Sequence, residues 1–293
     1  FKRSTDLLWS VTLPLESGYQ SSLTNVGVLD NRGIEFTVNS VNVNSKNFQW
    51  VTSFNITHNK NNVTELYDGK TDINKSIFVG HSLGEFYLLK ADGIWQVSEA
   101  SEASVYNAEP GDRKILDLKK DNQINSEDRE FCGRSTPAYF GGMTNTFKYR
   151  NIDLIVFINY AGGYYINNSL LRFLNSYNTW GNASVDYYNN YWKEDRPTNN
   201  YPAPRIGSSY SNGDGTDANL ENGAYIRIKN IELGYTLPQR WSGSLKASSI
   251  RGFISVQNLF TFTRYSGYDV EAAQQSNAYP GSRATLGGIS VNF

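Results

Sequence analysis

Long runs in which apolar and polar residues alternate constrain this chain more than any other feature of its sequence. Apolar side chains recur mostly at every second position across Lys46–His58, Ile152–Gly162 and Ile250–Asn258. A period of two places successive side chains on opposite faces of an extended chain, so each run is predicted to be a β-strand with one apolar and one polar face. Because this pattern dominates the sequence, the predicted fold class is all-β.

Two pairs of neighbouring runs are predicted to form β-hairpins because very short links join them. The first pair is Gly33–Val43 with Lys46–His58, and the second is Tyr139–Tyr149 with Ile152–Gly162. Further strands are predicted at Leu7–Leu15, Gly223–Leu237, Ser249–Thr263 and Arg283–Phe293.

Three places depart from regular alternation. The apolar positions change parity near Lys229-Asn230, which indicates either a β-bulge or a wrong strand assignment. The Asn- and Tyr-rich stretch at 164–201 is predicted to hold a short helix near Leu170–Tyr177 or Asp186–Trp192. The stretch at 202–223 is rich in Gly, Asn and Ser and is predicted to be a loop.

Strand length and spacing favour a transmembrane barrel. The runs extend over roughly ten to thirteen residues, whereas soluble strands most often have about 5–6 residues and tilted membrane-crossing strands about 9–11. Some links are tight turns and others are long, which is typical of a transmembrane antiparallel β-barrel. The alternative is a soluble secreted β protein that binds glycans and covers its apolar faces with a second layer.

Charge and residue counts exclude several classes. Lys and Arg number 27 against 28 Asp and Glu, so a strongly basic nucleic-acid binder is not expected. One Cys and two His leave no set for a cysteine-based zinc cluster and little for acid–base chemistry. The most apolar run is about as short as Leu154–Ile158, so no membrane-spanning helix is predicted.

The segment Gly80-His81-Ser82-Leu83-Gly84 matches G-x-S-x-G, the turn that carries the nucleophile of α/β-hydrolases. That fold places its histidine base after the serine, but no His follows Ser82 in this chain. Residues 85–88 favour an extended strand where the hydrolase fold needs a helix. The match is therefore interpreted as accidental, and no catalytic residue is predicted.

Residues 117–128 resemble a calcium-binding loop, in which oxygen ligands stand at the first, fifth, ninth and twelfth positions. Those positions hold Asp117, Asp121, Asn125 and Asp128. Lys119 stands at the third position, where an oxygen ligand belongs. The loop is predicted either to bind Ca²⁺ or to keep the shape of such a loop without an ion, and no other cofactor is expected.

Several stretches resemble, in the same order, those of one known family. They are Asn31-Arg32-Gly33-Ile34-Glu35, Trp50-Val51-Thr52-Ser53-Phe54-Asn55, residues 79–87, 223–231 and 233–238, Gly267-Tyr268-Asp269-Val270-Glu271 and the final Phe293. On these residues the chain resembles the C-terminal part of SusC/RagA-type TonB-dependent outer-membrane transporters, with Val270 in place of the family's proline.

The resemblance implies a barrel of about 22 strands around an N-terminal plug. Residues 1–293 are then a C-terminal portion of the barrel, roughly its last eight to ten strands, with long extracellular loops near 164–201 and 202–223. The plug and the TonB-contacting segment are expected in a missing N-terminal part. An open sheet would leave unpaired edges in the bilayer, so the remaining barrel is expected to close it.

The resemblance also implies a function without covalent chemistry. The family imports oligosaccharides or peptides across the outer membrane of Gram-negative bacteria, driven by TonB and together with a SusD-like surface lipoprotein. This chain is expected to supply barrel wall and loops. The sequence identifies neither the cargo nor the residues that bind it, and nucleic acid is not an expected partner.

Overall fold

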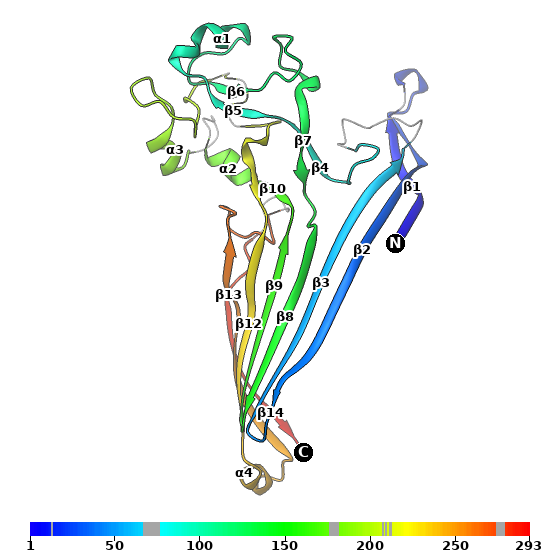
Figure 1. Cartoon of the computed structure of the whole chain (residues 1–293), viewed down its shortest axis with the longest axis vertical. Helices are drawn as coiled ribbons and strands as arrows, with labels where there is room; N and C mark the ends of the chain where they lie inside the picture. The colour runs from blue at the N-terminus through cyan, green and yellow to red at the C-terminus, as the bar shows by residue number, and fades with distance from the viewer. Residues whose placement is uncertain are drawn as a thin grey trace.

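A single antiparallel sheet organises the part of the chain that the structure, a computed structural model, describes: residues 1–12, 14–66, 77–175, 182–206, 208, 210, 213–273 and 279–293. Its eight strands lie side by side in chain order and form one tall, curved wall (Figure 1). They are β1 (Lys2–Thr12), β2 (Ser21–Asn44), β3 (Phe48–Glu65), β8 (Tyr139–Tyr149), β9 (Ile152–Gly162), β12 (Tyr225–Thr236), β13 (Ser249–Thr263) and β14 (Ala284–Asn292).

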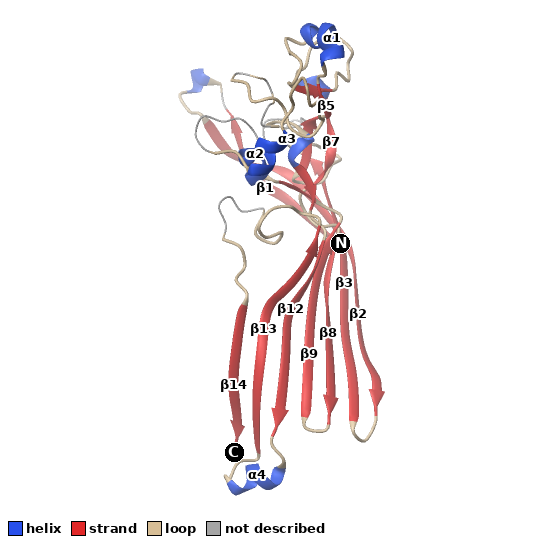
Figure 2. Ribbon diagram, turned by 90° about the vertical axis from the view of Figure 1, so that its left-hand side faces the viewer, coloured by secondary structure: helices blue, strands red, loops and turns tan. Residues whose placement is uncertain are grey.

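The two ends of the wall differ, as Figure 2 shows. At one end the strands are joined by short turns and by helix α4 (Gln239–Ser244). At the other end the connections form a loop domain, by which we mean the described residues of 77–135 and 164–223. It contains β4 (Glu85–Leu89), β5 (Ala91–Ile94), α1 (Ala100–Val105), β6 (Arg113–Ile115), β7 (Arg129–Arg134), β10 (Tyr165–Asn167), α2 (Ser169–Leu174), α3 (Val185–Asn190) and β11 (Leu220–Asn222).

One face of the sheet is apolar along the full width of the wall. Directly paired residues of neighbouring strands share a face, so the pairing register defines rows. One row contains Phe36, Ile56, Tyr160, Ile226 and Phe262, and another contains Trp50, Phe147, Leu154, Leu233 and Ile254. Ile34 is 73% exposed and Ile289 is 76% exposed, so no second layer of described residues covers them. This exposure argues against the soluble alternative.

The opposite face is polar and, among the paired rows between lipid-facing strands, holds charged residues such as Arg227, Arg251 and Asp153. One row contains Thr37, Asn55, Asn159, Arg227 and Thr261. Nearer the turn end, the Arg251 guanidinium binds Asp153 and lies 2.8 Å from Oε1 of Glu232. The apolar face suits hydrocarbon and the polar face suits a water-filled interior, so the predicted two-faced wall is confirmed.

A hydrogen-bonded chain satisfies several of the polar side chains on the apolar face. Asn145 Oδ1 accepts bonds from Trp50 Nε1 at 3.0 Å and from Thr52 Oγ1 at 2.7 Å. Thr52 Oγ1 in turn accepts from Asn42 Nδ2 at 2.7 Å, and Asn42 Oδ1 accepts from Ser40 Oγ at 2.9 Å. These groups bond to one another, which lowers the cost of placing them beside lipid.

The predicted β-bulge in β12 is confirmed. The register shifts between Ile228 and Asn230 against both β9 and β13. Ile228 pairs with Ile158 and Ile231 pairs with Val156, so both stay on the apolar face although three positions separate them. The extra residue, Lys229, therefore explains the change of parity in the sequence.

The largest difference from the predicted strands lies at the loop end. β2 has 24 residues and β3 has 18, longer than the predicted alternating runs. Their ladder continues through polar pairs such as Arg32 with Lys60. Beyond the membrane a strand needs no apolar face, so its ladder extends where the alternation has ended.

Other predicted segments need smaller corrections. The strand predicted at Leu7–Leu15 is β1, which starts at Lys2 and ends at Thr12, and Leu13 lies outside the described residues. Both helices considered for 164–201 are present, as α2 and α3. The predicted loop at 202–223 contains β11, which pairs with β10. Among the described residues no helix is long and apolar enough to cross a membrane.

Adjacent positions on β8 test the assignment of faces. Met143 pairs with Phe54 and Ile158 on the apolar face, and Thr144 points to the polar face. We expect Met143→Arg to destabilise the intact barrel by about 2–4 kcal/mol, the cost of a cation near the bilayer midplane. Urea unfolding in lipid vesicles measures the difference.

Thr144→Arg is the matched control, because it adds the same cation one residue further along the strand. It is expected to leave stability close to that of the unchanged protein. Equal destabilisation by both substitutions would contradict the assignment of faces.

Candidate ligand site in the loop domain

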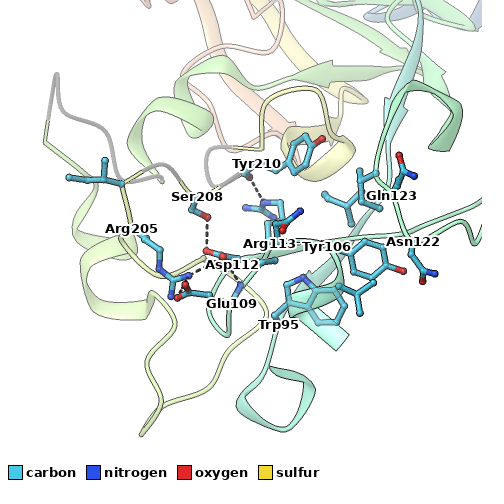
Figure 3. A pocket seen from close by; sticks show the side chains of 16 residues that line it. Trp95, Tyr106, Glu109, Asp112, Arg113, Asn122, Gln123, Arg205, Ser208 and Tyr210 are labelled. Atoms are coloured by element: carbon cyan, nitrogen blue, oxygen red, sulfur yellow. Dashed lines mark hydrogen bonds and ion pairs between the residues drawn. The ribbon is translucent and has the colours of Figure 1, made fainter. Parts of the chain in front are cut away.

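A cavity of about 530 Å³ lies in the loop domain, between segments that are far apart in the sequence. Figure 3 shows aromatic, amide and charged side chains around it. They come from the end of β5, the turn after α1, strand β6, the loop at 122–124 and the segment at 205–210. Its volume is within the usual range of about 300–1,000 Å³ for small-molecule sites.

Backbone hydrogen bonds join these segments. Trp95 N donates to Asp112 O at 2.9 Å, and Gly111 N donates to Trp95 O at 2.8 Å. Ala203 N then donates to Gly111 O at 2.8 Å, which brings the 205–210 segment to the cavity. Gly111 has a φ of +94°, and a Cβ atom there would lie 2.7 Å from the Trp192 ring. This close crossing requires glycine.

Asp112 fixes one side of the cavity. Its buried carboxylate accepts bonds from Ser208 Oγ at 2.6 Å, from Arg205 Nη1 at 3.0 Å and from Glu109 N at 2.9 Å. Arg205 Nη1 also lies 3.0 Å from Oε2 of Glu109 (Figure 3). Asp112 and Glu109 therefore both form ion pairs with Arg205.

Aromatic rings form another side. Trp95 and Tyr106 lie nearly parallel, with ring centroids 6.0 Å apart and an interplanar angle of 21°. Lys114 Nζ lies 4.5 Å from the centroid of the Trp95 ring and 2.7 Å from Oε1 of Glu99. The hydrogen bond between Lys114 and Glu99 raises the pKa of Lys114 and lowers the pKa of Glu99. The charged pair holds the indole in place.

The loop at 117–128 forms the rim and is held by its own carboxylates. Asp128 is fully buried and accepts bonds from the backbone amides of Leu118 (3.0 Å), Lys119 (3.1 Å) and Asn125 (2.9 Å). Asp117 accepts from the amides of Lys120 at 2.6 Å and Asn122 at 2.9 Å.

The four predicted calcium ligands therefore have internal partners. Asp121 accepts a bond from Gln123 N, and Asn125 accepts one from Glu127 N. Within the described ranges, no group of three or more His, Cys, Asp or Glu residues has a metal-binding arrangement. Hydrogen bonds alone account for the loop's shape, and Ca²⁺ binding stays a prediction.

The serine in the hydrolase-like motif has a structural role. Ser82 is buried, and its Oγ donates to the carbonyl of Asn61 at 2.9 Å. His81 stacks on Phe131 with centroids 3.6 Å apart, and its Nδ1 lies 3.0 Å from Oε2 of Glu85. A strand, β4, follows the motif, as the sequence predicts.

A second charged group lies on the polar face of the wall, and we call it the lumen ion cluster: Arg227, Lys229, Asp269 and Glu271. Arg227 binds Asp269 and Glu271, each at 2.5 Å. The side chains of Arg227 and Asp269 are 5% and 7% exposed. Val270 packs in a buried group with Ala161, Tyr164 and Ile166. Residues 269–271 of the β13–β14 connection are therefore fixed against the polar face.

Comparisons with known proteins agree with this architecture. No family model matches the chain. TonB-dependent receptor P3 of Formosa agariphila is 30% identical over 324 residues, which cover 99% of this chain and 31% of that receptor. TonB-dependent receptor SusC of Bacteroides thetaiotaomicron is 27% identical over 100% of this chain and 29% of SusC. The chain spans about a third of the length of these relatives.

Solved structures show the same fold. A structure titled as the RagAB peptide transporter superposes with a TM-score of 0.80 at 23% identity, over 99% of this chain and 32% of the matched one. The fold and the relatives place the chain among transmembrane β-barrels of transporters. The resemblance to the C-terminal barrel portion of SusC/RagA-type TonB-dependent receptors is thereby confirmed. These relatives are named as receptors and transporters, not as enzymes.

The buried carboxylate of Asp128 provides a test of the rim. Asp128→Ala removes the acceptor of three backbone amides, at a cost of about 1–3 kcal/mol for buried groups left unpaired. We expect the loop at 117–128 to be cleaved faster in limited proteolysis. Asp121→Ala, which removes an exposed acceptor of one amide, is the control and should change little.

The lumen ion cluster provides another test. Arg227→Met leaves the buried carboxylate of Asp269 without its cation, which is expected to cost about 3–5 kcal/mol. Protease cleavage between residues 264 and 273 should then increase. Lys229→Met removes a cation that is 37% exposed and should have a much smaller effect. Similar cleavage of both variants would mean that Arg227 does not hold this segment.

Proposed function

We propose that the protein containing this chain imports oligosaccharides or peptides across the outer membrane in a TonB-dependent manner. The chain supplies part of the barrel wall and the extracellular loops. Its action is binding and passage of cargo rather than catalysis, and it requires no cofactor and no nucleic acid. A Ca²⁺ ion held by Asp117, Asp121, Asn125 and Asp128 is a separate prediction that transport does not depend on.

The division of the sheet into two faces is the observation that carries this proposal. An exposed apolar face behind a polar, charged face is what a wall between lipid and a water-filled passage needs. The loop domain at one end and short turns at the other match the two sides of an outer membrane, where long loops face outward. The relatives are named TonB-dependent receptors, and the superposed solved structure is named a peptide transporter, which supports the transporter class.

Open edges support the proposal that other strands complete the barrel. β1 pairs with β2 only as far as Asn31, so residues 32–44 of β2 have no partner on that side among the described strands. β14 pairs with β13 and forms the other edge. Unpaired backbone groups are costly in lipid. We propose that the remaining barrel of the same protein pairs with both edges around a plug that contacts TonB.

The loop domain is the proposed contact surface for a SusD-like surface lipoprotein. It rises above the wall at the end away from the short turns (Figure 1). Several of its apolar side chains are strongly exposed, among them Val185 at 76%. A lipoprotein that caps the barrel would cover such residues when it closes over captured cargo.

Deletion of the gene tests the proposed function. In an outer-membrane-bearing host, cells that lack the intact receptor should no longer take up its fluorescent oligosaccharide or peptide cargo. The unchanged gene should restore uptake, and a proton uncoupler should abolish it. The receptor itself should require detergent for extraction and migrate differently on gels after heating. Uptake that continues unchanged in the deletion strain, across both cargo classes, would contradict the proposal.

A further inference from the structure

One cationic side chain in the loop-domain cavity has no acidic partner among the described residues. Arg113, on β6, lines the cavity, and its Nε donates to the backbone carbonyl of Tyr210 at 3.1 Å (Figure 3). Its two terminal nitrogens have no acceptor among the described residues, and no carboxylate of those residues lies within 4.0 Å. A guanidinium has five N–H donors arranged to grip a carboxylate with two parallel bonds. Most of this capacity is unused.

Arg113 differs in this respect from the other arginine of the cavity. Arg205 binds Asp112 and Glu109, so its charge is already matched by the acids of that side. Arg113 is half-buried, and this burial lowers the pKa of its guanidinium. The negative charge of Asp217 opposes the shift without forming an ion pair with Arg113. Asp217 itself accepts a bond from Ala91 N at 2.8 Å and lies 3.9 Å from Lys90. Among the described residues, Arg113 therefore faces the cavity with no carboxylate in contact with it.

We propose that the cavity binds a carboxylate group of the ligand through the terminal nitrogens of Arg113. The inference rests on the proposed import function and names the chemical class of its cargo. A carboxylate occurs in two candidate sources, the uronic acid units of an acidic oligosaccharide and the C-terminus of a peptide. Both present a planar pair of oxygens that matches the guanidinium.

The rest of the cavity suits such a ligand. Tyr106 offers a ring on which a sugar or a side chain stacks, and Asn122 and Gln123 place amide groups at the rim. Asn122 has a left-handed φ of 63°, and the bond from its amide to Asp117 fixes this turn. The self-bonded loop at 117–128 thus places neutral polar groups beside the cation.

Binding to the purified intact receptor tests the inference. Four probes are compared by calorimetry: trigalacturonic acid, its methyl ester, a tripeptide with a free C-terminus, and the same tripeptide with an amidated C-terminus. We expect at least one free acid to bind about 10- to 100-fold more tightly than its neutral counterpart, the usual effect of a charge-assisted bidentate contact. Which pair shows the difference identifies the source.

Substitution of the arginine completes the test. Arg113→Gln should remove the preference for the acid, Arg113→Lys should retain part of it, and binding of the neutral probe should stay unchanged. Arg240→Gln, on α4 at the opposite end of the wall, is the control for a lost cation and should bind all probes normally. An acid preference that survives in Arg113→Gln would overturn the inference, and so would equal binding of the acids and their neutral counterparts or no binding of either acid.

Failure of this inference is distinguishable from failure of the proposed function. If the acids do not bind but gene deletion still abolishes uptake of a neutral oligomer, the carboxylate assignment is wrong and the importer remains. If deletion changes no uptake, the importer is wrong whatever the binding results.

Discussion

The need to hydrogen-bond every backbone group inside a bilayer determines the rest of this structure. A strand satisfies its N–H and C=O groups only through its neighbours, so strands that cross lipid must form one continuous ladder. Side chains must then divide between two faces, because the ladder leaves them no other direction. The rows of apolar residues on one face and of Thr, Asn and Arg on the other follow from this constraint.

The loop domain obeys a different rule. Besides its buried apolar side chains, such as Ile94, Trp95 and Ile166, it is held by polar side chains that bond to nearby backbone. Asp112 and Asp128 are both buried, and each accepts three hydrogen bonds that tie one segment to another. Buried carboxylates are tolerated only when their oxygens are satisfied in this way. The result is a cavity in which Arg205 matches Asp112 and Glu109, while Arg113 contacts no carboxylate of the described residues.

The sequence predicted the wall far better than the cavity. Alternation located β8, β9 and β13 with the bounds found in the structure, and the parity change located the bulge. Alternation indicates a strand only where one face meets lipid. It therefore did not predict the parts of β2 and β3 that extend beyond the membrane. No such pattern in the sequence indicates the cavity. Trp95, Arg113 and Arg205 are distant in sequence and meet only through long-range backbone contacts. The sequence predicts a calcium motif at 117–128, and it gives no sign that these carboxylates also accept bonds from the backbone amides of the loop.

The bulge in β12 has a consequence for insertions and deletions in this strand. Lys229 is the extra residue against β9, so its removal would restore regular pairing with that strand. Against β13 the same position stands opposite two residues, Asn258 and Leu259, and its removal would leave both without a partner in β12. Loss of almost any other single residue of β12 would move the side chains of half the strand to the opposite face of the sheet. Pairing with β13 therefore gives a reason to keep Lys229, although pairing with β9 does not. Its ammonium also lies 2.8 Å from Glu271, so one residue both spans the irregularity in β13 and adds a second electrostatic anchor for the β13–β14 connection.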